Sequence, residues 1–142
     1  MLAEEVKSLV SQDHSLELAR LDQVTLEIPP LAMRRALRNL LINAATHGKG
    51  GTVELASNEN AVLVRISDSG PGIPDMLLER VFEPFFRADP SRTQTVPGAG
   101  LGLAIAREII ERAGGRLSIR NRASGGLVQE ISFPARGPSP SD

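Results

Sequence analysis

The chain has 142 residues, a formal net charge of -1 and no cysteine, which excludes disulfides and thiolate metal sites. The near-neutral charge, the absence of Trp and Tyr, and only four Phe residues argue against a nucleic-acid partner that needs a basic or base-stacking surface. No apolar stretch approaches the ~18 residues of a membrane span. We therefore expect one globular domain over residues 1–134 and a disordered tail over residues 135–142, which are rich in Pro and Ser.

The first half of the chain alternates between helical and extended patterns. Apolar residues at 3.6-residue spacing indicate helices, and alternation of apolar and polar residues indicates strands. These patterns predict helices at 2–10 and 31–47, and strands at 24–28, around 53–55 and at 61–67. The Pro29-Pro30 pair is expected to end the first of these strands.

The second half begins with a loop over residues 68–74, which Asp75 follows as a candidate cap for a short helix ending near Val81. Further patterns predict a long loop at 83–100, a helix at 101–113, and two strands around 117–119 and 127–133. The last two strands form a hairpin, and no strict βαβ alternation occurs. The expected fold class is therefore α+β, a mixed sheet covered on one face by helices.

Two asparagines stand out on the predicted helix 31–47. Asn39 and Asn43 are four residues apart, so they share one face and flank the apolar stripe. Amides at the rim of a buried face need hydrogen-bond partners, which nearby loop backbone can supply. Alternatively, an asparagine oxygen can ligate Mg²⁺, a hard cation that prefers oxygen ligands.

Asp68 directly follows the predicted strand 61–67. It continues the every-second-residue pattern of Val62, Val64 and Ile66, so its side chain is expected to point into the core. A buried carboxylate requires hydrogen-bond donors. They can come from an Asx turn that organises Ser69 and Gly70, or from an exocyclic amino group such as that of adenine. Gly70 and Gly72 would let a flat ring approach the backbone closely.

A run of alternating glycines, Gly98, Gly100 and Gly102, leads directly into the predicted helix 101–113. Unpaired amides at a helix N-terminus favour a phosphate. The run is not a P-loop, because no Gly-Lys-Ser/Thr follows, and Leu103 stands where a dinucleotide fingerprint needs glycine. A flexible hinge before a helix is the alternative interpretation.

The stretch FEPFFR, residues 82–87, places three aromatic residues beside the long loop. They are interpreted as a hydrophobic latch. Arg87 and Arg92 can contact phosphate oxygens, although isolated loop arginines are more often solvated.

Taken in order, four stretches are far more specific than any one of them: LRNLLINAATHG (37–48), DSGPGIP (68–74), FEPFFR (82–87) and GAGLGLAI (98–105). This order resembles the ATP-binding catalytic domain of sensor histidine kinases, over nearly the whole chain from about Leu2 to Phe133. That family belongs to a wider group with gyrase, a heat-shock chaperone and mismatch-repair ATPases. The resemblance implies the Bergerat fold, a two-layer α/β sandwich.

The resemblance further implies ATP and Mg²⁺ as ligands. By that resemblance Asn43 ligates Mg²⁺ and Asn39 lies beside the phosphates, so both are the expected catalytic residues. Asp68 would read the adenine amino group, and residues 83–97 would form an ATP lid anchored by the phenylalanines. The other expected nucleotide-binding residues are His47, Gly70, Gly72, Ile73, Phe86, Arg87, Arg92, Gly98, Gly100, Leu101, Gly102 and Leu103.

Two departures from the family pattern bear on activity. Thr46 occupies a position where the family often has Lys or Arg, which leaves Arg87, Arg92 or His47 to compensate. Asn39 occupies the position where hydrolytic relatives carry a glutamate that activates water. An amide cannot accept a proton at neutral pH, so the resemblance favours a kinase over an ATPase.

The acceptor histidine of the family is not recognisable, because neither His14 nor His47 lies in an H-E/D-x-x-x-P motif. We therefore expect transfer to a histidine on a separate dimerisation and acceptor helical domain, with a response regulator as an indirect partner. The expected location is a cytoplasmic domain of a membrane-bound sensor kinase, without membrane contact of its own. A stand-alone anti-sigma serine kinase and a nucleotide-binding signalling module without transfer are the alternatives.

Overall fold

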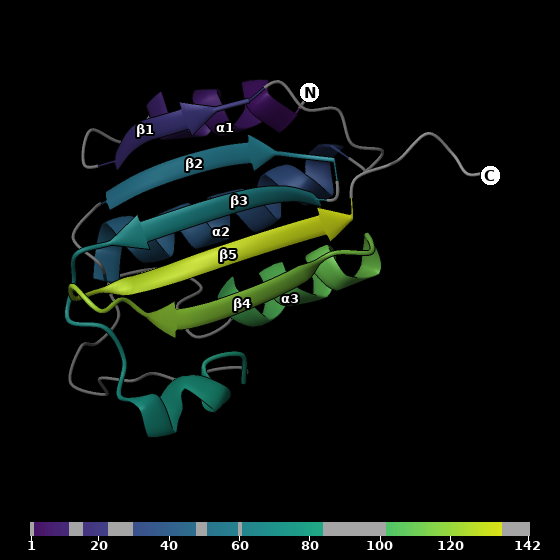
Figure 1. The fold of residues 1–142 in the computed structure, drawn as a ribbon. Helices are drawn as coiled ribbons and strands as arrows, with labels where there is room; N and C mark the ends of the chain where they lie inside the picture. The colour runs from purple at the N-terminus through teal and green to yellow at the C-terminus, as the bar shows by residue number, and fades with distance from the viewer. Residues whose placement is uncertain are drawn as a thin grey trace.

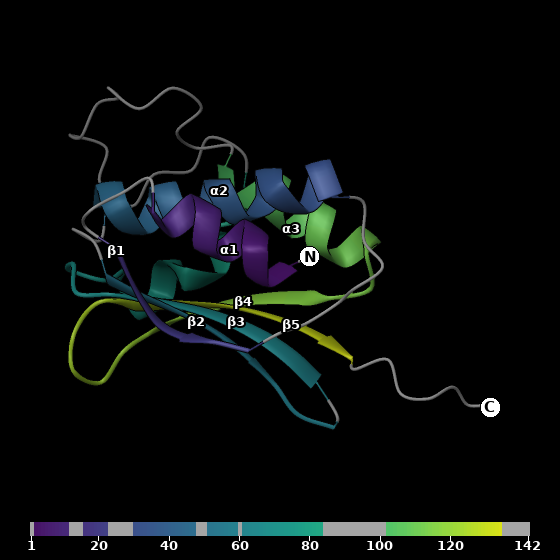
Figure 2. The same ribbon diagram turned by 90° about the horizontal axis from the view of Figure 1, so that it is seen from above.

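In the computed structural model, helices cover one face of a five-stranded sheet (Figures 1 and 2). The structure describes residues 2–11, 16–22, 30–47, 51–59, 61–83 and 102–134. Its elements are α1 (Leu2–Ser11), β1 (Leu16–Leu21), α2 (Pro30–His47), β2 (Gly51–Ser57), β3 (Ala61–Asp68), the 3₁₀-helix η1 (Asp75–Arg80), α3 (Gly102–Arg112), β4 (Arg116–Asn121) and β5 (Leu127–Pro134). The predicted α+β class and the helix-covered sheet are confirmed.

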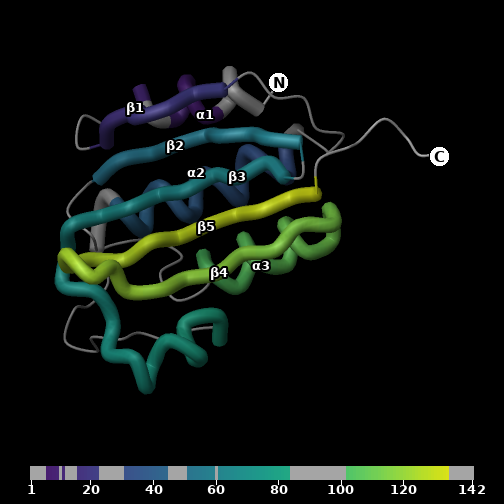
Figure 3. Tube along the Cα trace, in the orientation of Figure 1, coloured from purple at the N-terminus to yellow at the C-terminus, as the bar shows by residue number. Residues whose placement is uncertain are grey.

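The sheet is mixed, with strand order β1-β2-β3-β5-β4. β1 runs parallel to β2, whereas the β2–β3, β3–β5 and β4–β5 pairs are antiparallel. The last strand therefore lies inside the sheet, between β3 and β4 (Figure 3). As a result, β5 borders the C-terminal end of β3, where Asp68 lies.

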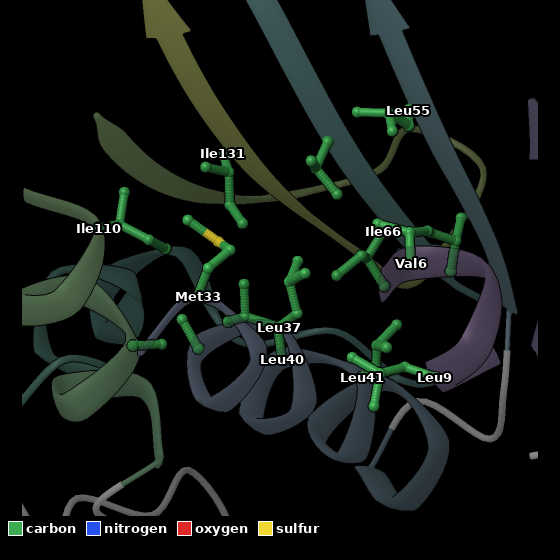
Figure 4. Close-up of a cluster of buried hydrophobic side chains, with 14 of the residues drawn as sticks. Val6, Leu9, Met33, Leu37, Leu40, Leu41, Leu55, Ile66, Ile110 and Ile131 are labelled. Atoms are coloured by element: carbon green, nitrogen blue, oxygen red, sulfur yellow. The ribbon is translucent and has the colours of Figure 1, made fainter. Parts of the chain in front are cut away.

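The core lies between the helices and the sheet (Figure 4). Inward residues of β3 alternate strictly with half-buried ones, as the period of two requires. The apolar stripe predicted for α2 is buried throughout: Met33, Ala36, Leu37, Leu40, Leu41 and Ala44. Burial of one of its Leu or Met side chains contributes about 1.5–3 kcal/mol, which fixes α2 firmly against the sheet.

The sequence analysis missed β1. It predicted a strand at 24–28, but residues 23–29 lie outside the described part of the chain, and the described strand is Leu16–Leu21. β1 is an edge strand with an irregular register between Leu18 and Arg20, so its apolar alternation is weak. The predicted tail, 135–142, also lies outside the described residues.

Asp22 joins the end of β1 to β2. Its carboxylate accepts hydrogen bonds from the Ser57 backbone amide at 2.9 Å and from the Arg20 guanidinium at 3.0 Å. The hydrogen bond from Arg20, together with that from Ser57, lowers the pKa of Asp22. The edge strand is thus held by a charged side chain as well as by its ladder.

The sheet face opposite the helices carries charged side chains. Arg65 on β3 lies between Glu130 on β5, at 2.8 Å, and Glu54 on β2, at 3.5 Å. The hydrogen bond with Glu130 raises the pKa of Arg65. Exposed pairs of this kind contribute little to stability, but they keep this face polar.

Candidate functional site

Asp68, at the end of β3, is 2% exposed, as its parity predicted. Its Oδ1 accepts hydrogen bonds from the Gly70 amide at 3.0 Å and from the Leu127 amide at 3.1 Å. The first of these is the Asx turn that the sequence offered as one interpretation, and the second ties the carboxylate to β5. No described residue donates to its other oxygen, Oδ2, which therefore retains its capacity to accept.

Gly126 lets the β4–β5 turn lie directly against Asp68. Its φ is 91°, and a Cβ at this position would collide with the Asp68 carbonyl oxygen. That carbonyl also accepts a hydrogen bond from Arg122 Nη1 at 2.8 Å. The turn therefore encloses Asp68 on the side of β5.

Asn121 holds the 68–74 loop against the end of β4. Its Nδ2 donates to the Ile73 carbonyl at 2.6 Å and to Asp75 Oδ1 at 2.8 Å, while its Oδ1 accepts from the Ile73 amide at 3.0 Å. Gly72 has a φ of 76°, and a Cβ there would lie 2.6 Å from Asn121 Oδ1. The glycine is needed for the loop to approach this asparagine so closely.

The role predicted for Asp75 was wrong. Pro74 is at the N-cap position of η1 and makes no capping bond through its side chain. The carboxylate of Asp75 instead accepts from Asn121 Nδ2. The hydrogen bonds of Asn121 to the loop, which we call the Asn121 clamp, bring its side-chain amide next to the start of η1.

We predict that Asn121→Ala destabilises the domain by about 1–3 kcal/mol, because it leaves the polar backbone groups of Ile73 without their partners. A urea unfolding curve monitored by circular dichroism measures this change in the free energy of unfolding. Arg120→Ala, at the exposed neighbour on β4, is the matched control and is expected to change stability by less than about 0.5 kcal/mol. An unchanged urea midpoint for Asn121→Ala would show that the loop does not depend on this clamp.

Asn39 and Asn43 lie one turn apart on α2 and contact different partners. Asn39 Nδ2 donates to the Gly102 carbonyl at 3.3 Å, and Asn43 Nδ2 donates to Gln129 Oε1 at 3.3 Å. Gly102 begins α3, and a Cβ on it would lie 3.8 Å from Asn39 Cβ. The structure thus brings the first and the last of the four sequence stretches together. Neither asparagine Oδ1 accepts a hydrogen bond from a described residue.

Gln129 is a site residue that the sequence analysis missed. It is fully buried, and its Nε2 donates to the Leu40 carbonyl of α2 at 3.1 Å. Gln129 and Asp68 are the buried polar side chains among the described residues, and both belong to this site. The overlooked signal is its parity, since Gln129 occupies an inward position of β5 along with Leu127 and Ile131.

β5 connects the two parts of the site. Leu127 contacts Asp68 and Gln129 contacts Asn43. The two β5 residues are two positions apart, which corresponds to about 7 Å along a strand. A buried carboxylate and a row of amides therefore lie at one end of the sandwich, where β3, β5 and α2 meet.

The other predicted nucleotide-binding residues fall into two groups. Within the described part, the backbone of Ile73 is held by Asn121, and Leu103 packs partly buried against the core. The second group lies outside the described part of the chain. It consists of the His47 side chain and of the predicted lid and glycine-run residues Phe86, Arg87, Arg92, Gly98, Gly100 and Leu101. Phe82, the described beginning of the aromatic stretch, packs against the core with the Arg107 guanidinium 4.8 Å from its ring centre.

Within the described ranges, no cluster of three or more His, Cys, Asp or Glu side chains could hold a metal ion. None of the described helices is both long enough and apolar enough to span a membrane.

The chain is a two-layer α/β sandwich, in which helices cover a mixed sheet and a buried aspartate at a strand end lies near asparagines of the facing helix. The model of the histidine kinase-, DNA gyrase B- and HSP90-like ATPase family matches residues 29–137, and the chain belongs to this family. The resemblance carried by the four sequence stretches is therefore confirmed.

Curated relatives include sensor histidine kinase GtrS of Pseudomonas aeruginosa, which is 44% identical over 108 residues, covering 76% of this chain and 22% of GtrS. Sensor protein IrlS of Burkholderia pseudomallei is 34% identical over 129 residues, covering 89% of this chain and 28% of IrlS. The chain thus spans about a quarter of the length of these relatives.

Among solved structures, the mycobacterial sensor histidine kinase MprB superposes with a TM-score of 0.75 at 28% identity, covering 94% of this chain and 93% of that one. The nucleotide-free catalytic domain of histidine kinase ThkA gives a TM-score of 0.74 at 29% identity, covering 94% and 91%. The predicted two-layer sandwich is thus found in histidine kinase catalytic domains.

Proposed function

We propose that this chain is the catalytic domain of a two-component sensor histidine kinase, which binds Mg-ATP and transfers its γ-phosphoryl group to a histidine on a separate helical domain. The observation that carries the proposal is the site itself. One carboxylate oxygen of the buried Asp68 receives no donor from the described residues, and β5 links this aspartate to the amide of Asn43.

Asp68 is suited to recognise adenine. Two backbone amides fix Oδ1, so the carboxylate cannot rotate without breaking them, and Oδ2 remains to accept from the exocyclic amino group. Asn121 holds the backbone of Ile73 in the loop that follows Asp68, and Gly72 lies close to the same asparagine. A rigid acceptor discriminates well, because a base without the amino group would leave a buried polar atom unpaired.

Asn43 fits a magnesium ligand. Mg²⁺ is bound in nucleotide sites by one or two protein oxygens together with phosphate oxygens and water, so a single amide oxygen suffices. Asn43 donates through Nδ2 to Gln129, and among the described residues no group donates to its Oδ1. When bound, Mg²⁺ would neutralise charge on the phosphates.

Asn39 supports transfer rather than hydrolysis. Its Nδ2 is held by the Gly102 carbonyl, next to the start of α3, where helix amides favour phosphate. An amide cannot take a proton from water, so no base at this position activates a hydrolytic attack. Phosphoryl transfer depends mainly on positioning and electrostatics, which this arrangement supplies.

The partners follow from the relatives. These relatives are named as a sensor histidine kinase and a sensor protein, which favours a histidine acceptor over the serine acceptor of an anti-sigma kinase. We infer that the acceptor helices belong to the same full-length kinase and that a response regulator receives the phosphoryl group afterwards. The domain would act on the cytoplasmic side of a membrane-bound sensor.

A mixing experiment tests this function. The purified chain is incubated with Mg²⁺ and γ-labelled ATP, together with a histidine-bearing helical hairpin or with serine-containing candidate proteins. We expect label on the hairpin that is labile to acid and stable to base, and none on a hairpin with the histidine replaced by alanine. Acid-stable label on serine would support the serine kinase instead, and ATP binding without transfer would support the signalling module.

A further inference from the structure

Gln129 is out of place on the inward face of β5. Its neighbours on that face are buried and apolar, including Ile131, which is 0% exposed. Burying an amide among them is costly unless its polar atoms are paired, whereas an apolar residue of similar shape would fit the core at little cost. Packing alone therefore does not account for a glutamine here.

The direction of its hydrogen bonds is fixed from the backbone. The Leu40 carbonyl can only accept, so the atom of Gln129 that faces it must be the donor, Nε2, at 3.1 Å. Oε1 consequently faces Asn43, at 3.3 Å. Because Oε1 can only accept, Asn43 must present its own donor, Nδ2, to Gln129. The Oδ1 of Asn43 is thereby turned away from Gln129.

We propose that Gln129 is a positioning residue that sets the orientation of the Asn43 amide, so that Oδ1 rather than the NH₂ group faces the metal of Mg-ATP. The proposal rests on the proposed function, in which Asn43 is a magnesium ligand. If the Asn43 amide were rotated by half a turn, its NH₂ group would face the cation, and this group cannot act as a metal ligand. Partners that orient metal ligands typically change metal affinity by about 10–100-fold when they are removed.

The test measures ATP affinity twice for each variant, once with Mg²⁺ and once in EDTA. The ratio of the two affinities reports the contribution of the metal, and a merely structural role of Gln129 would not change it selectively. Gln129→Leu keeps the volume and removes both polar atoms. We expect it to lower the ratio about 10-fold or more while the affinity in EDTA stays within twofold of wild type.

Two controls separate the possible causes. Ile131→Val, on the same strand and face, loosens the core without touching Asn43 and should keep the full ratio. Asn43→Ala removes the ligand itself and should lower the ratio at least as much as Gln129→Leu. If Asn43→Ala keeps the full ratio, the magnesium assignment fails and the positioning role with it. If Asn43→Ala lowers the ratio but Gln129→Leu keeps it, the positioning role alone is overturned.

A second variant covers the case in which Gln129→Leu does not fold. Gln129→Met keeps the length of the side chain, removes both polar atoms and fits an apolar core with little strain. We expect it to lower the magnesium-dependent gain in ATP affinity as Gln129→Leu does. A folded Gln129→Met protein that keeps the full gain would overturn the proposal.

Discussion

Asn43→Ala is expected to abolish magnesium-dependent phosphoryl transfer. Removing the amide deletes the oxygen that Gln129 leaves available for the cation. Loss of a single preorganised group that stabilises charge in the transition state typically lowers the rate by ~100-fold or more. The rate of label transfer from γ-labelled ATP to the histidine hairpin, measured over a range of Mg²⁺ concentrations, gives this loss directly.

The substitution also has a structural effect that must be separated from the catalytic one. Without Asn43, the buried Oε1 of Gln129 loses its donor, which costs about 1–3 kcal/mol of stability. Circular dichroism and thermal unfolding therefore accompany the rate measurement. Ile42→Ala, at an exposed neighbour on α2, should transfer at the wild-type rate. Wild-type transfer by a folded Asn43→Ala protein would remove Asn43 from the magnesium site.

Asp68→Asn is expected to weaken ATP binding by about 1–3 kcal/mol while leaving the fold intact. Asparagine retains an oxygen that can accept from the Gly70 and Leu127 amides, so these two bonds survive. Its NH₂ group then occupies the place of Oδ2 and opposes the amino group of adenine, donor against donor. Competition against a fluorescent nucleotide measures the change in affinity.

Two comparisons show whether this loss concerns adenine. Wild type should bind an ATP analogue without the 6-amino group more weakly than ATP, and Asp68→Asn should lose this preference. Asp68→Ala leaves both backbone amides unpaired, so it should destabilise the domain, unlike the asparagine variant. An equal preference for ATP in wild type and Asp68→Asn would mean that another group reads the base.

Strong periodicity made most of the fold predictable. The stripe of α2 and the strict alternation of β3 each leave one arrangement that buries the apolar residues, and both were found where the sequence placed them. β1 was missed because an edge strand is buried little and its register is irregular, so its pattern is faint. Tertiary contacts with β2 determine that strand more than local preference does.

The site was predictable only in part. Asp68 could be placed by parity, and Asn39 and Asn43 by helical spacing, because these follow from a single element. Gln129 and Asn121 act through partners far away in the sequence, in α2 and in the loop after β3. No local pattern specifies such partners, although a polar residue at an inward strand position indicates that one must exist.

Three hydrogen bonds of the site join segments that are distant in the sequence. Asn39 and Gly102 are 63 positions apart, Asp68 and Leu127 59, and Asn43 and Gln129 86. Forming each of these bonds closes a long loop, and the entropic cost of closing it is offset only by the contacts of the assembled sheet. An unfolded or half-folded chain therefore contains no weaker version of the site. Nucleotide is then a ligand of the native state alone, and it stabilises the entire domain by an amount that grows with the ratio of its concentration to its Kd.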